Sequence, residues 1–161
     1  MSDQAFEFLY EIVPFSTIPR EELKDHSRKI WIEKKSKGTV LRMQGKSEVD
    51  FLIIVKNGLI EAYHEIGGKK TFADRLGRGD FCGGVSLLMN AGVSLRTVSA
   101  LTDASYYVMP KSTFLEICDR HDSIREYLID IYNRRMLDES YVTTLATGQA
   151  VQFLSGVAPF S

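Results

Sequence analysis

The pattern of apolar and polar positions divides the chain into a helical start, a long β-rich middle and a helical end. Residues 4–13 place apolar side chains three and four positions apart, which predicts a helix that ends at Pro14. Pro19 begins a second, short helix, for which we expect Thr17 to act as the N-cap. We assign residues 1–28 to these N-terminal helices.

The middle of the chain, residues 29–110, consists of short β-rich runs separated by glycine turns. This texture predicts a mainly β fold, an eight-stranded jelly-roll (double-stranded β-helix) barrel. Asn57-Gly58 is the clearest turn signal, because both residues tolerate positive φ. The clearest runs are residues 30–32, 39–43, 51–55, 59–63, 71–76, 95–101 and 106–109.

Helical spacing returns after Pro110, and we assign residues 111–147 to C-terminal helices. Ser112 is the expected N-cap of a first helix, and a longer helix follows. Residues 148–161 read as an apolar tail or as the start of a linker to a following domain. One face of the longer helix carries an apolar stripe, through which we expect a homodimer to form: Ile124, Leu128 and Ile131.

Composition narrows the class of protein. The 161 residues are 44% hydrophobic, which suits one globular domain. The net charge of −1 argues against a nucleic-acid partner, which would need a clustered basic excess. The 2 cysteines and 3 histidines lie apart, so we expect neither a disulfide framework nor a metal site, and His64 alone cannot supply a cupin-type metal cluster.

The sequence shows no targeting signal and no apolar stretch that approaches the roughly 20 residues needed to cross a bilayer. We therefore expect a cytoplasmic protein without a membrane partner. Because the metal cluster of a cupin-type enzyme is missing, we also expect no cofactor and no catalytic activity in this chain itself, whereas a longer parent protein could carry a catalytic domain.

Residues 79–88 are the strongest candidate for ligand chemistry. They read Gly-Asp-Phe-Cys-Gly-Gly-Val-Ser-Leu-Leu, a glycine-rich turn that opens a short apolar helix, and Arg96 follows eight residues later. Backbone N–H groups at such a turn point toward an anion, and the helix dipole favours negative charge there. This local pattern therefore favours a phosphate-bearing ligand.

The order of elements and several motifs resemble the cyclic-nucleotide-binding domain over roughly residues 15–136. The resemblance implies a non-catalytic regulatory module that senses cAMP, cGMP or another small phosphate-bearing ligand and relays binding through the C-terminal helix. A variant cassette ending in Ser-Leu-Leu is similar to a bacterial subgroup in which such a domain precedes CBS and nucleotidyltransferase domains. The matching motifs are Pro14-Phe15 with Ile18-Pro19, Lys37 to Leu41 with Gln44-Gly45, Asp50 to Ile54 with Asn57-Gly58, Gly79 to Leu88, and Thr97 to Asp103.

Two residues depart from the family pattern. The position of the family's glutamate, which holds the ribose 2′-hydroxyl, is Gly84 here, and the position of its phosphate-binding arginine is Ser94. A hydroxyl brings no charge to a phosphate, so binding is weakened unless another cation compensates. The ligand-binding residues that the resemblance implies are Gly83, Gly84, Val85, Ser86, Ser94, Leu95, Arg96 and Thr97.

Arg96 is the candidate for that cation. A regular strand over residues 94–100 would place it on the same inward face as Val98 and Ala100. A buried arginine needs an anionic partner, which is either the ligand or an internal carboxylate. The internal candidates are Glu61, Asp74 and Asp80, and a twisted strand would instead turn Arg96 to solvent.

Tyr127 and Tyr132 lie on the long helix, where the family often places a residue that stacks on the base. Core or dimer packing is the alternative role for both side chains. The same choice applies to the whole chain, which is either a sensor or a degenerate module that binds no nucleotide and serves in dimerisation or domain docking.

Overall fold

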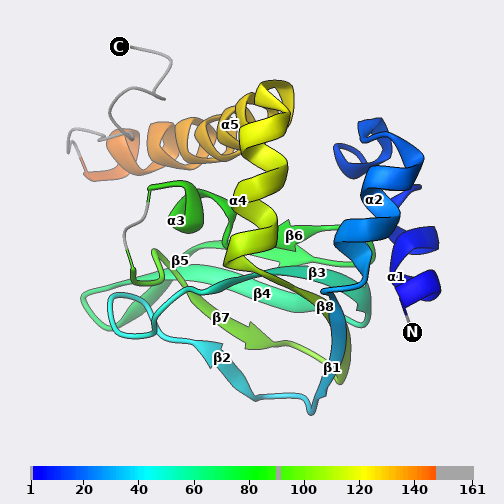
Figure 1. Cartoon of the computed structure of the whole chain (residues 1–161). Coiled ribbons are helices and arrows are strands. Elements are labelled where there is room, and N and C mark those ends of the chain that lie inside the picture. The colour runs from blue at the N-terminus through cyan, green and yellow to red at the C-terminus, as the bar shows by residue number, and fades with distance from the viewer. Residues whose placement is uncertain (1, 90–91, 148–161) are drawn as a thin grey trace.

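Two four-stranded antiparallel sheets and a set of helices on one side of them make up the computed structural model (Figure 1). The structure describes residues 2–89 and 92–147, with side chains described over 4–89 and 92–134. The helices are α1 (Ser2–Leu9), the 3₁₀ helix η1 (Phe15–Thr17), α2 (Arg20–Ser27), α3 (Gly84–Met89), α4 (Lys111–Arg120) and α5 (Asp122–Thr147). The strands are β1 (Trp31–Lys35), β2 (Val40–Arg42), β3 (Phe51–Asn57), β4 (Ile60–Ile66), β5 (Lys69–Leu76), β6 (Phe81–Cys82), β7 (Thr97–Ala100) and β8 (Ala104–Pro110).

The strand orders are β1-β8-β3-β6 in one sheet and β2-β7-β4-β5 in the other. This arrangement confirms the predicted mainly β, eight-stranded jelly roll with helices at both ends.

Strand β3 explains how the apolar run of residues 51–55 is used. Ile53 and Val55 pack into the core between the two sheets, whereas Leu52 and Ile54 pack against the helices. Since successive side chains of a strand point to opposite faces, a strand buried on both sides needs a continuous apolar sequence.

The turn after β3 requires glycine at one position. Gly58 has φ +82°, and a Cβ there would lie 2.2 Å from the Asp103 carbonyl oxygen. Asn57 does not share the positive φ that we had allowed for both turn residues, since Phe72 is the one non-glycine residue of the described chain with positive φ.

Both predicted N-caps are wrong. The residue before α2 is Pro19 and the residue before α4 is Pro110, and neither helix has a side-chain cap. The Thr17 hydroxyl instead donates to the Pro14 carbonyl oxygen at 2.7 Å, and Ser112 already lies inside α4. Each proline holds its backbone extended just before the helix and so sets the start of the helix.

The strand predicted over residues 95–101 is shorter than expected. Pairing with β4 begins at Thr97, and residues 95–96 form a bend before β7. The two-residue alternation that we used to turn Arg96 inward therefore does not apply.

The apolar stripe of α5 packs within the chain itself. Ile124 and Leu128 are buried in the core beneath the helices, and Ile131 is half-buried. The prediction that this stripe forms a dimer interface is therefore wrong for its two buried members, because their surfaces are already covered. The predicted tail at 148–161 lies outside the described residues, and no described helix is long and apolar enough to span a membrane.

Candidate functional site

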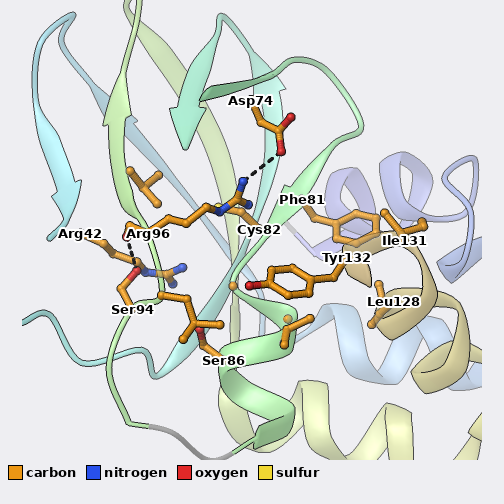
Figure 2. A pocket seen from close by; sticks show the side chains of 15 residues that line it. Arg42, Asp74, Phe81, Cys82, Ser86, Ser94, Arg96, Leu128, Ile131 and Tyr132 are labelled. Atoms are coloured by element: carbon orange, nitrogen blue, oxygen red, sulfur yellow. Dashed lines mark hydrogen bonds and ion pairs between the residues drawn. The ribbon is translucent and has the colours of Figure 1, made fainter. Parts of the chain in front are cut away.

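A pocket lies between the glycine turn, the ends of neighbouring strands and α5 (Figure 2). The turn and α3 form one side, β2, β5 and the bend before β7 form the second, and α5 closes the third. Its lining residues are Arg42, Asp74, Phe81, Cys82, Gly83, Gly84, Val85, Ser86, Ser94, Leu95, Arg96, Val98, Leu128, Ile131 and Tyr132.

Most of the residues predicted from sequence line this pocket. They are Gly83, Gly84, Val85, Ser86, Ser94, Leu95 and Arg96, with Tyr132 from α5. Thr97 does not line it: the Thr97 hydroxyl donates to Glu65 Oε1 at 3.1 Å and accepts from the Gln44 N–H. Tyr127 does not line it either, and its side chain is 37% exposed.

Gly83 and Gly84 are glycines for different reasons. Gly83 has φ +98°, and a Cβ there would lie 2.5 Å from Arg42 Nη1. At Gly84, the first residue of α3, a Cβ would meet Phe114 and Leu52 carbon atoms at 3.5 and 3.6 Å, which are ordinary contacts. A side chain at position 84 therefore starts toward the apolar core.

Arg96 forms an internal ion pair. Its Nη1 lies 2.9 Å from Asp74 Oδ2, and the two side chains are 14% and 23% exposed. Of the three carboxylates that the sequence offered, the structure selects Asp74. A β-bulge lies next to Asp74 in the pairing of β4 with β5. Ala62 pairs with Asp74, but two residues further along β4 His64 pairs with Thr71, so β5 has one residue more than β4 at this point.

Ser94 is engaged by its own neighbourhood. The Ser94 hydroxyl donates to the Arg96 carbonyl oxygen at 2.5 Å. A hydroxyl has one proton to donate, so Ser94 cannot also donate to a ligand while this bond is present. Ser94 therefore does not replace the charge of the family's arginine.

Arg42 is the pocket residue that sequence reasoning missed. Its side chain is 3% exposed, its Nη2 donates to the Phe51 carbonyl oxygen, and its guanidinium carbon lies 4.7 Å from the centre of the Phe51 ring. The signal that could have revealed it is a charged residue inside the apolar run of residues 39–43.

His64 lies near enough to the Arg96–Asp74 pair for both charges to act on it, but it does not line the pocket. Its Nε2 is buried without a hydrogen-bond partner, and its ring meets the Phe72 ring edge-on at 5.6 Å. Burial, reinforced by repulsion from Arg96 and opposed by Asp74, lowers the pKa of His64 below its ordinary value of 6.5. His64 is therefore neutral at pH 7.

The charges of the lining favour a singly charged anion. Arg42 and Arg96 bring two positive charges and Asp74 brings one negative charge, so the lining has a net charge of about +1. Across the part of the chain that the structure describes, no group of three or more His, Cys, Asp or Glu side chains is placed to hold a metal ion.

Solved structures share this fold at low sequence identity. The regulatory domain of Toxoplasma gondii protein kinase A with cAMP has a TM-score of 0.69 and 21% identity, over 81% of this chain and 49% of that one. The regulatory subunit of a cAMP-independent protein kinase A from Trypanosoma cruzi, bound to guanosine, has a TM-score of 0.66 and 20% identity, over 94% and 53%.

The sensor domain of the transcriptional regulator DNR from Pseudomonas aeruginosa has a TM-score of 0.60 and 13% identity, over 69% of this chain and 78% of that one. The chain spans about half the length of the solved proteins that it matches first. No curated protein sequence matches it.

The sequence model of the cyclic nucleotide-binding domain matches residues 32–121, which is more than half of the chain. This segment runs from the second residue of β1 through α4 and contains the whole pocket lining apart from the side chains of α5. The chain therefore belongs to the cyclic nucleotide-binding domain family.

Proposed function

We propose that this chain is a non-catalytic regulatory module that binds a small anionic ligand of the cyclic-nucleotide type in the pocket described above. The observation that carries the proposal is the meeting of three parts at one pocket: the glycine turn, two arginine side chains and the apolar face of α5. A cyclic phosphodiester carries one negative charge, which complements the net charge of the lining.

The position of α5 supports a relay through this helix. Leu128, Ile131 and Tyr132 form one wall of the pocket, so a ligand that fills it contacts α5 directly. A ligand shifts a conformational equilibrium only by its differential affinity for the two states, and these contacts are where that difference would arise. An attached domain, of the CBS or nucleotidyltransferase type that the sequence resemblance suggested, would receive the signal.

The solved relatives suggest which ligands to test first. The Toxoplasma gondii relative contains cAMP and the Trypanosoma cruzi relative contains guanosine. For this chain, cAMP, cGMP and guanosine are therefore the first probes, and the uncharged guanosine separates recognition of the base from recognition of the phosphate.

A second candidate function rests on the departures from the family pattern. Gly84 offers no side chain to a ribose. The Ser94 hydroxyl already donates to the Arg96 carbonyl oxygen, and the Arg96 guanidinium already forms an ion pair with Asp74. These features fit a degenerate module that keeps the barrel and the long helix for dimerisation or domain docking.

Isothermal titration calorimetry with the three probes at up to millimolar concentration decides between the two candidates. Binding of cAMP or cGMP supports the sensor, and the absence of heat and of a thermal shift with every probe supports the degenerate module. Hydrogen exchange over residues 122–134 tests the relay, because a ligand held against α5 should slow exchange there.

Tyr132 and Tyr127 offer a matched pair of variants on α5. Stacking of an aromatic side chain on a base contributes about 1–3 kcal/mol, so Tyr132→Ala should weaken nucleotide binding by roughly 5- to 150-fold. Tyr127→Ala removes an exposed side chain outside the pocket and should leave affinity unchanged. Equal affinities of the two variants would contradict a base cap at Tyr132.

The homodimer also stays a prediction, and its interface would have to use surfaces other than Ile124 and Leu128. Analytical ultracentrifugation of the chain tests it, and a monomer at all concentrations would contradict it.

A further inference from the structure

Arg42 is the only buried lysine or arginine among the described side chains. It ends β2, opposite Val98 of β7 in the sheet register, and its long side chain lies in the interior rather than in solvent. Burial of a guanidinium costs several kcal/mol unless a counter-charge and hydrogen bonds compensate.

The compensation that the structure provides for Arg42 is incomplete. Its Nη2 donates to the Phe51 carbonyl oxygen and its guanidinium faces the Phe51 ring, but both partners are uncharged. Its Nε is buried with no hydrogen-bond partner. Over residues 4–89 and 92–134, no carboxylate forms an ion pair with Arg42, which leaves a buried positive charge without a counter-charge.

The Arg42 guanidinium also lies where a bound anion is expected. It lines the same pocket as Ser86 and Ser94, and Figure 2 shows it pointing into that pocket beside Ser94. Its Nη1 approaches Gly83 so closely that a Cβ would lie 2.5 Å away. The cation is therefore packed against the glycine turn itself, within the lining of the pocket.

Arg96 is less suited to this role. Its Nη1 is held by Asp74 at 2.9 Å, and a ligand anion would have to compete with that carboxylate. Arg42 has no such competitor among the described residues.

We propose that Arg42, from β2, supplies the charge that binds the ligand's phosphate, and that the Arg96–Asp74 ion pair is a structural wall of the pocket. The inference deepens the proposed function by naming the residue that recognises the anion. It applies to any ligand with a singly charged phosphate group, because the guanidinium fork can bind two oxygen atoms of such a group.

The test compares Arg42→Met with Arg96→Met, using two probes: inorganic phosphate and cAMP. Methionine keeps much of the length of the side chain and removes the charge. Thermal shift at constant ionic strength measures the phosphate response, and calorimetry measures cAMP binding. Arg28→Met serves as the surface control, since Arg28 is 70% exposed, directly follows α2 and is not part of the pocket lining.

We expect Arg42→Met to weaken binding of both probes by roughly 10- to 100-fold, the usual loss for a charge-assisted hydrogen bond. Arg96→Met should weaken binding of both probes clearly less, and Arg28→Met should leave binding unchanged. If Arg42→Met does not fold, Arg42→Lys replaces it, because lysine keeps the charge but loses the fork and should still weaken both probes more than Arg96→Lys does.

The outcomes separate this inference from the proposed function. If wild type responds to phosphate but not to cAMP and Arg42→Met loses the phosphate response, the assignment of Arg42 stands and the cyclic-nucleotide proposal fails. If wild type and Arg42→Met bind cAMP equally, the assignment fails and the function stands. The assignment is also overturned if Arg96→Met loses as much as Arg42→Met, or if wild type responds to neither probe.

Discussion

Replacement of Gly83 by alanine should destabilise the fold by displacing Arg42. The new Cβ would lie 2.5 Å from Arg42 Nη1, closer than any stable contact, and the backbone would have to keep φ +98°. A left-handed backbone costs a residue with a Cβ about 1–2 kcal/mol. Arg42 must then move, and loss of its hydrogen bond to the Phe51 carbonyl oxygen costs about 1.5–3 kcal/mol.

The two contributions together predict a loss of about 2.5–5 kcal/mol in the free energy of unfolding for Gly83→Ala. Gly84→Ala is the matched control, because its Cβ meets Phe114 and Leu52 at ordinary distances and its φ is not positive. Such a substitution commonly stabilises by about 0.4–1 kcal/mol, since it restricts the unfolded chain.

Urea denaturation followed by circular dichroism measures both variants under the same conditions. A natural domain is stable by about 5–15 kcal/mol, so a loss of about 2.5–5 kcal/mol leaves a folded population to measure in all but the least stable domains. A loss of less than about 1 kcal/mol would mean that the backbone tolerates the side chain and that Arg42 moves without cost. That result would refute the claim that Gly83 and Arg42 are fitted to each other.

Three further predictions concern groups around the barrel. In a double-mutant cycle of Arg96→Met and Asp74→Asn, the coupling free energy should be about 1 kcal/mol because the pair is half-buried, and strict additivity would contradict the ion pair. The folded chain binds the His64 proton only at a lower pH than the unfolded chain does, so stability should fall as the pH drops from about 7 to 5. His64→Gln should reduce that slope in denaturation at several pH values, and an unchanged slope would assign it to other groups. Tyr106→Phe removes the hydroxyl that donates to Glu33 at 3.0 Å and should cost about 1 kcal/mol in urea denaturation, and a neutral result would contradict a contribution of this bond.

The sequence was sufficient for the strands whose pattern is local. The apolar run at residues 51–55 and the turn at Gly58 predict β3 and its end, because pleat and turn chemistry depend on neighbouring residues. The sequence could not show which face of β3 packs on the helices and which on the second sheet, since both faces are equally apolar. That choice depends on the pairing of strands far apart in the chain.

The candidate site divides in the same way. The glycine turn was recognisable, because its residues are contiguous. The ion-pair partner of Arg96 was not recognisable, since the sequence allowed three carboxylates. Which of them pairs with Arg96 depends on the other contacts that each carboxylate makes. The Glu61 carboxylate forms an ion pair with Lys70 Nζ at 2.6 Å, and the Asp80 carboxylate accepts a hydrogen bond from the Gly77 N–H at 2.9 Å.

The residues that define the family's cassette cannot simply be restored in this chain. A side chain at position 84 starts toward Phe114 and Leu52, so a glutamate there would have to turn away from the apolar core to keep its carboxylate solvated. An arginine at position 94 would add a third cation to a pocket that already holds Arg42 and Arg96. Like charges that line one pocket repel each other. The charges of the pocket are therefore consistent with one another. Arg42 lies against the glycine turn and supplies one positive charge. The net charge of the lining stays at about +1 because position 94 is uncharged and the charge of Asp74 offsets that of Arg96.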